Sequence, residues 1–184
     1  MDTWIWILLV VLAVLVLAAV AGVASRSRRS SRLREGFGPE YERVVDETGS
    51  RRDAERELED RRERHEELEI RPLSATAQTR YAEEWQQVQE RFVDDPAAAV
   101  QSADGLVAQA MEERGYPMDD FEQRAADVSV DHPDVVENYR QGHQLVEDHR
   151  AGRGSTEDLR QAMVHYRALF EQLLEDGRTR EEVS

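Results

Sequence analysis

The chain has 184 residues, 39 acidic and 24 basic side chains, and a formal net charge of −15. A field of this sign repels a phosphate backbone, so we expect no nucleic-acid partner. No cysteine is present, which excludes disulfides, thiolate metal ligands and a thiol nucleophile.

The first element is an apolar run of 21 residues, 4–24, that carries no charge. As a helix this run would be about 31 Å long, close to the roughly 30 Å hydrocarbon core of a bilayer. Trp4 and Trp6 lie at one edge, where indole rings prefer the headgroup region. We therefore expect residues 1–24 to form a transmembrane anchor that contacts membrane lipid through these two side chains.

A basic segment, residues 25–35, follows the apolar run and is expected to be a juxtamembrane linker. Its arginines, candidates for lipid contact, are Arg26, Arg28, Arg29, Arg32 and Arg34. Because positively charged flanks stay on the cytoplasmic side, the N-terminus should face outward. The C-terminal domain should then be cytoplasmic, in a single-pass protein of the cell membrane.

Two other interpretations of the N-terminus stay open. Residues 22–24 (Gly-Val-Ala) resemble a signal-peptide cleavage site, which would make this an exported protein. The missing basic flank and the length of the apolar run argue against cleavage. Ala18 and Gly22 form a small-xxx-small pair that permits close packing of two spans, so a homo-oligomer is an alternative.

We expect residues 36–176 to form one helical domain, beginning with a short helix from Pro39. Ser50 is placed to cap the next helix, over residues 51–69. Only Ala54, Leu58 and Leu68 are apolar on its buried stripe, and Arg61 and His65 fill the positions between them. This sparse pattern favours a solvated helix resting on the domain over a stalk or a helix that finds a partner.

Four bulky residues then recur at helical spacing over residues 74–93, and they favour core packing over cofactor stacking. They are Tyr81, Trp85, Val88 and Phe92. Asp95 and Pro96 are an N-cap and first-turn pair that starts another helix, which should end near Gly115.

The last helices are expected to open at Tyr116-Pro117, at Asp131-His132-Pro133 and at Ser155, with the final helix over residues 156–175. Gly177 should end that helix and leave residues 177–184 as a disordered tail. The fold class is therefore all-α: one transmembrane helix followed by a soluble bundle of about six or seven amphipathic helices.

Several motifs together resemble a family of uncharacterised bacterial proteins, often from GC-rich actinobacteria. The stretches that carry the resemblance are residues 37–41 (FGPEY), Arg80-Tyr81, Trp85, 92–96 (FVDDP), 114–117 (RGYP), 120–127 (DFEQRAAD), 131–133 (DHP), 165–167 (HYR) and Leu169-Phe170. The resemblance covers about residues 35–175. It implies an N-terminal membrane segment with a small helical domain, and it implies no particular activity.

No pattern of catalytic or metal-ligating residues stands out. His143 and His149 are six residues apart and so do not share a helix face, and no His-x3-His pair occurs. Acidic clusters occur at Asp94-Asp95, at Asp119-Asp120 and at Asp131 with His132, and all three sit at the starts of expected helices, where Asp caps free N–H groups. We expect no cofactor, no metal and no enzymatic activity.

Residues 114–133 are the densest mixture of Gly, Pro, aromatic and charged side chains, and they are the candidate surface for a protein partner. Its members are Tyr116, Asp120, Arg124, Asp127 and His132. The leading hypothesis is a membrane-tethered, non-enzymatic helical adaptor that binds another protein. The alternatives are a small-molecule sensor or enzyme with a pocket in the bundle, and an exported helical protein.

Overall fold

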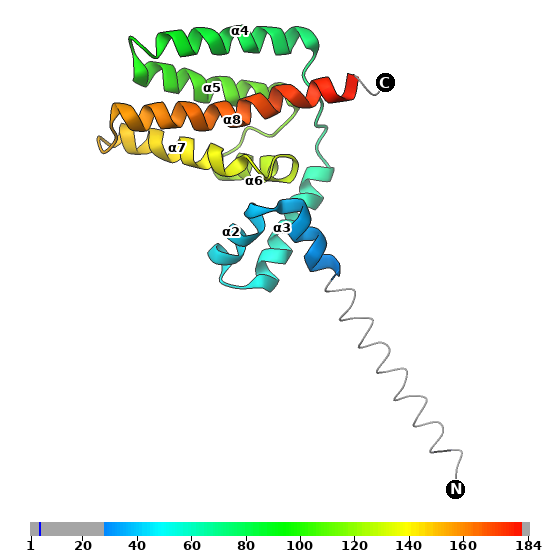
Figure 1. Cartoon of the computed structure of the whole chain (residues 1–184). Helices are drawn as coiled ribbons and strands as arrows, with labels where there is room; N and C mark the ends of the chain where they lie inside the picture. The colour runs from blue at the N-terminus through cyan, green and yellow to red at the C-terminus, as the bar shows by residue number, and fades with distance from the viewer. Residues whose placement is uncertain (1–3, 5–27, 182–184) are drawn as a thin grey trace.

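The computed structural model describes residues 4 and 28–181, with side chains through residue 175, and within these ranges all regular structure is helical (Figure 1). Residues 28–37 form the first described helix. The others are α2 (Pro39–Thr48), α3 (Arg51–Glu66), α4 (Ala75–Arg91), α5 (Pro96–Arg114), α6 (Phe121–Asp131), α7 (Val136–Arg150) and α8 (Thr156–Glu181). The predicted all-α class is confirmed.

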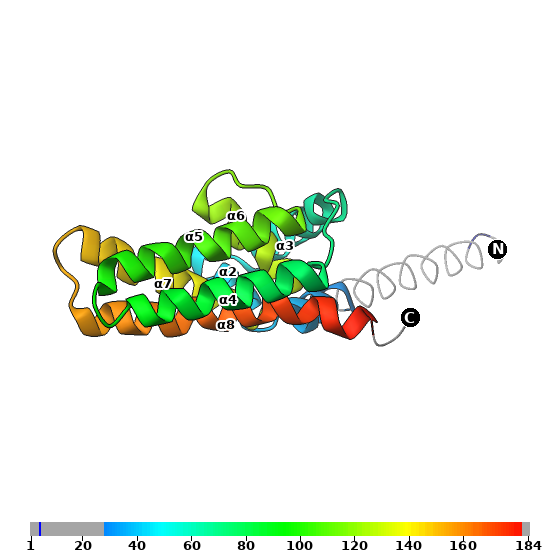
Figure 2. The ribbon, with the colours of Figure 1, turned by 90° about the horizontal axis from the view of Figure 1, so that it is seen from above.

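Two antiparallel hairpins, α4–α5 and α7–α8, lie side by side with both turns at one end (Figures 1 and 2). Helix α8 packs against α5 and α7, and the short α6 lies beside α7. The predicted apolar stripes meet in this core, where Trp85 stacks on Phe170 with ring centroids 4.5 Å apart. Tyr81 meets the same ring edge-on at 6.4 Å. We call residues 75–175 the bundle.

Polar caps start the helices at the predicted residues. The side chains of Ser50, Ser74 and Asp95 each accept a hydrogen bond from the backbone N–H three residues later. Gly115 ends α5 with φ of +101°, a left-handed conformation that disfavours any side chain. A Cβ there would also lie 2.7 Å from the carbonyl oxygen of Glu69.

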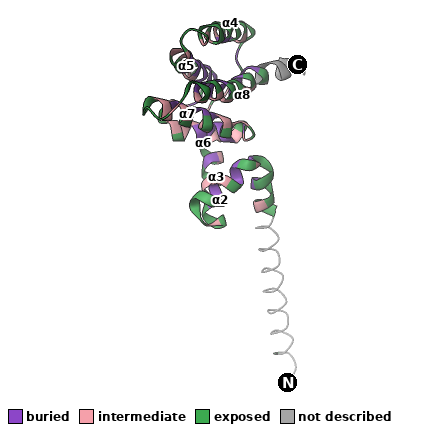
Figure 3. Ribbon diagram, turned by 60° about the vertical axis from the view of Figure 1, so that its left-hand side comes forward, coloured by how far each residue is buried: buried purple, intermediate pink, exposed green. Residues whose placement is uncertain are grey.

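A second, smaller group of helices lies beneath α6 and α7 (Figure 1). The helix of residues 28–37 packs with α2 and α3, and we call residues 28–66 the N-terminal unit. It has its own apolar cluster, separate from that of the bundle: Leu33, Phe37, Tyr41, Val44, Ala54 and Leu58. Figure 3 shows these two buried regions and the exposed outer faces of both groups.

The described part of the predicted linker is helical. Residues 28–35 continue into the helix that ends at Phe37, and the Leu33 and Phe37 side chains are buried in the N-terminal unit. Arg29 and Arg34 form ion pairs with carboxylates of α3 and α2. This segment therefore belongs to the folded part, because its two apolar residues are one helical turn apart and face one cluster.

Three helix boundaries differ from the prediction. Helix α6 begins at Phe121 rather than Tyr116, because Asp120 caps it and accepts a hydrogen bond from Gln123 N–H at 2.8 Å. Helix α7 begins at Val136, and Asp131 ends α6 instead of starting the next helix. Helix α8 runs past Gly177 to Glu181, since a glycine weakens a helix by about 1 kcal/mol without forcing its end.

The predicted anchor over residues 1–24 lies outside the described residues except for Trp4, whose side chain is 80% exposed. Trp6, Arg26, Ala18 and Gly22 also lie outside them. Where the chain is described, none of its helices has the length and apolar character needed to cross a bilayer.

Candidate functional site

The predicted partner surface is divided between the interior and the exterior. Tyr116, Asp127 and His132 are buried, Asp127 with only 1% of its surface exposed. Asp120 is exposed and is used as the α6 cap, and Arg124 is half-buried on the same helix. These five side chains therefore do not converge on one exposed face.

Tyr116 instead takes part in a polar network between the bundle and the N-terminal unit. Its hydroxyl donates to Asp131 Oδ2 at 2.5 Å, and His65 Nε2 of α3 lies 2.7 Å from the same oxygen. The hydrogen bond that His65 donates to Asp131 raises the pKa of His65. Burial alone would raise the pKa of Asp131, but the bonds from His65 and Tyr116 outweigh it, so the pKa is lowered.

The neighbouring buried polar groups contact residues both near to them and far from them in sequence. Arg114 Nη1 lies 3.3 Å from His132 Nε2 and donates to the Leu173 carbonyl at 3.3 Å. Asp127 Oδ1 accepts from Gln123 Nε2 at 2.8 Å, whereas its buried Oδ2 has no hydrogen-bond partner in the described part of the chain. Burial raises the pKa of Asp127.

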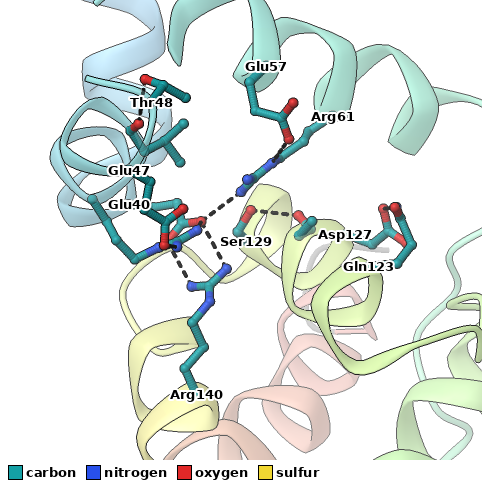
Figure 4. Close-up of polar contacts among 12 residues, drawn as sticks. Glu40, Glu47, Thr48, Glu57, Arg61, Gln123, Asp127, Ser129 and Arg140 are labelled. Carbon is teal, nitrogen blue, oxygen red and sulfur yellow. Dashed lines mark hydrogen bonds and ion pairs between the residues drawn. The ribbon is translucent and has the colours of Figure 1, made fainter. Parts of the chain in front are cut away.

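The most concentrated set of charges surrounds Glu40 of α2, which is 2% exposed (Figure 4). Arg43 of the same helix donates to both carboxylate oxygens, at 2.8 and 2.6 Å. Arg61 of α3 donates to Oε1 at 2.7 Å. Arg140 of α7, 100 residues away in sequence, also donates to both oxygens, at 2.8 and 3.0 Å. One carboxylate thus joins three helices, and we call these four residues the Glu40 cluster.

The charges of the Glu40 cluster are balanced at its outer edge. Glu57 accepts from Arg61 at 3.0 Å, and Glu47 pairs with Arg43. Burial would raise the pKa of Glu40, but the bonds and charges of Arg43 and Arg140 lower it. Glu40 is therefore an ionised carboxylate whose hydrogen bonds go to arginines, which suits a structural anchor more than proton transfer.

Sequence reasoning found only one sign of the Glu40 cluster. Arg61 occupies a position in the stripe of α3 where an apolar residue is expected, and the structure shows it buried. Nothing in the local sequence identifies Arg140 as the partner of Glu40.

The bundle has a surface groove of about 160 Å³ between α4 and α8. It is lined by Gln89, Phe92, Arg160, Met163, Val164 and Arg167. The rings of Tyr81, Trp85 and Phe170 bridge the same two helices deeper in the core. Val164 is 53% exposed, which makes it one of the few large apolar side chains on the surface of the bundle.

Two tyrosine hydroxyls are buried inside the bundle, and both are poorly suited to act as nucleophiles. The Tyr139 and Tyr166 side chains are fully buried, with the Arg124 side chain beside the first hydroxyl and the Asp104 side chain beside the second. Burial raises the pKa of both. A hydroxyl held in its protonated form is a poor nucleophile at neutral pH.

No group of three or more His, Asp or Glu side chains is placed to hold a metal ion within residues 28–175. No protein-family model, curated protein or solved structure matches this chain. A function can therefore be proposed only from the geometry of the structure and from the sequence.

Proposed function

We propose that this chain is a membrane-tethered, non-enzymatic interaction domain that binds another protein through the groove between α4 and α8. In this proposal residues 4–24 span the cell membrane with the N-terminus outside. The arginines that follow the span set this orientation, and the bundle lies on the cytoplasmic side.

The groove is the observation that carries the proposal. Its apolar lining comes from Phe92, Met163 and Val164, on two helices that are bridged by aromatic rings rather than by close backbone packing. A volume of about 160 Å³ is below the roughly 300–1,000 Å³ of typical small-molecule pockets. It suits one or two apolar side chains of a protein partner, as in helix-in-groove recognition.

The charges beside the groove indicate which kind of helix fits. Arg160 and Arg167 lie seven residues apart on α8, about 10.5 Å or two turns, and flank Met163 and Val164. Each is roughly half-exposed and, among the described side chains, pairs with a carboxylate on its own helix. Such surface pairs contribute about 0–1 kcal/mol, so a partner's carboxylates can replace them at little cost. The proposed partner is therefore an amphipathic helix with acidic residues beside its apolar face.

The proposal is tested by photo-crosslinking in intact bacterial membranes, with the photoreactive residue at Val164 of the full chain. We expect a discrete protein adduct that is lost in the R160E/R167E double variant, because reversed charges repel an acidic partner. The matched control carries the photoreactive residue at Val93, which is 84% exposed but does not line the groove.

An adduct that is equally strong from both positions, or unchanged by the charge reversal, would rule out the groove as the binding site. Membrane attachment is tested separately by extracting the membranes at alkaline pH. Release of the chain by that treatment would contradict the anchor and leave the groove hypothesis standing.

A further inference from the structure

The boundary between the N-terminal unit and the bundle is polar. The two apolar clusters are separate, and from the bundle only the half-buried Val130 packs on the cluster of the unit. The side-chain contacts across the boundary include the Glu40–Arg140 pair, the pairing of His65 with Asp131 and the approach of the His65 ring to the Tyr116 ring, and α3 packs on α6. The two apolar cores are therefore not continuous, and charged side chains contribute much of what joins the two groups.

The N-terminal unit keeps most of its own interactions without the bundle. Glu40 is bound by Arg43 and Arg61, which belong to the unit, as well as by Arg140. Removal of Arg140 leaves the carboxylate with two guanidinium partners, so no uncompensated buried charge results. Arg140 itself would become hydrated, which relieves the burial that lowers its pKa.

The two groups are also joined by a short covalent connection. Residues 67–74 lead from α3 to α4, and the Arg71 N–H donates to the Arg114 carbonyl at 2.9 Å. Gly115 lies directly against Glu69, where a Cβ would clash. This segment is fixed on the bundle, so rotation of the unit would occur where α3 ends, near Glu67.

We propose that the Glu40–Arg140 pair is a latch, and that the N-terminal unit undocks from the bundle as a folded body when this pair opens. The transition is cooperative because water entering the boundary raises the local dielectric constant and weakens both ionic contacts together. Undocking exposes a charged face of α6 and α7 that includes Asp131 and Arg140. Neither the apolar segment of residues 4–24 nor the groove between α4 and α8 takes part in this motion.

The test measures a distance across the boundary in the full chain. The protein has no cysteine, so two can be introduced at the exposed residues Asp46 of α2 and Ala151 after α7, and spin-labelled. We expect a single narrow distance distribution in the parent protein. In R140Q we expect a second, broad component, with the undocked population raised about tenfold or more, because the two charge-assisted hydrogen bonds from Arg140 to Glu40 that hold the docked form are lost.

The matched control is R43Q, which removes a guanidinium from the same carboxylate within the unit and should keep the parent distance. R140K keeps the charge but cannot form the two-pronged bond, so it should give an intermediate population and remain informative if R140Q does not fold. Hydrogen exchange should show α2 and α3 still protected in the undocked form. A parent-like distance in R140Q and R140K, or loss of protection throughout the unit on undocking, would overturn the latch.

Discussion

The bundle and the N-terminal unit reach a buried interior by different means. In the bundle, α8 alone contributes a run of apolar residues from Leu159 to Leu174, and its rings stack against those of α4. In the unit, α3 buries just two apolar residues, Ala54 and Leu58, and the next buried position on that face is Arg61. A helix poor in apolar residues can therefore still be part of a folded core when its buried charge is fully paired.

This difference has an energetic consequence. Apolar contacts in the bundle do not depend on the partner's charge, whereas Arg61 requires Glu40 and Glu57 in place. The bundle should therefore respond to changes of side-chain volume, and the unit to changes of charge as well. Variants in the two regions should therefore differ in what they lose.

The largest effect is expected from Phe170→Ala in the bundle. It removes the ring that stacks on Trp85 and meets Tyr81, and such truncations cost about 3–5 kcal/mol of unfolding free energy. Urea unfolding of the full chain in detergent micelles, followed by circular dichroism, measures the loss. Val164→Ala on the exposed face of the same helix is the control and should change stability by less than about 0.5 kcal/mol. Equal losses in the two variants would contradict the assigned core.

The second prediction concerns Leu58→Ala, which opens a cavity in the N-terminal unit. We expect a loss of about 2–5 kcal/mol that is confined to the unit, because its apolar cluster is separate from that of the bundle. Hydrogen exchange should speed up in α2 and α3 and stay unchanged in α5 and α8. The control is Leu68→Ala, a truncation of the same kind at a half-buried residue. If exchange in the bundle rises equally, the two clusters form one cooperative core.

The third prediction is a pH dependence at the boundary. The pKa of His65 is raised above its ordinary 6.5, so its stabilising contribution is complete below pH 6.5 and is lost as the pH rises through the folded-state pKa. The pKa of Asp131 is lowered from 3.8, so its contribution is present above that value and is lost as the pH falls through its folded-state pKa. The boundary should be most stable between these two ranges.

Urea unfolding at a series of pH values from 5 to about 9 measures this dependence. His65→Gln should flatten the decline on the alkaline side, while His149→Gln, at the far end of α7, should leave it unchanged. A parental decline in His65→Gln would show that another group is responsible.

The smallest effect is expected at the start of α5. Asp95→Ala removes the carboxylate that accepts the Ala98 N–H at 3.0 Å, and loss of an N-cap costs about 1 kcal/mol. Asp94→Ala removes the adjacent charge without removing the cap and should cost only a few tenths of a kcal/mol. Thermal unfolding of both variants gives the difference, and indistinguishable midpoints would show that the cap contributes nothing beyond its charge.

Much of the fold could be predicted because its signals are local. The caps at Ser50, Ser74 and Asp95 act within three residues, and the stripe of α4 repeats within one helix. The errors fall where a tertiary contact competes with a local signal. Asp131 resembles an N-cap in sequence, but its carboxylate is used by Tyr116 and His65, and α7 begins later without a side-chain cap.

The candidate site was less predictable than the fold. Residues 114–133 are rich in Tyr, Asp, Arg and His and were predicted to form a partner surface. Three of the five predicted members, Tyr116, Asp127 and His132, are buried. The groove depends on Phe92 of α4 and Met163 of α8, which are far apart in sequence. Neither a buried charge cluster nor a groove between two helices has a periodic signature within one helix.

The helical class, most helix starts and the apolar faces can be predicted from the sequence, since hydrogen-bonding caps and the 3.6-residue period act over a few residues. The sequence also places Arg61 in the stripe of α3 at a position where an apolar residue is expected. The tertiary structure shows that Arg61 pairs with Glu40 and that Arg140 joins the same carboxylate from 100 residues away. The physical reason is that any exposed carboxylate can attract an arginine, whereas the packing of three helices selects the one carboxylate that water cannot reach.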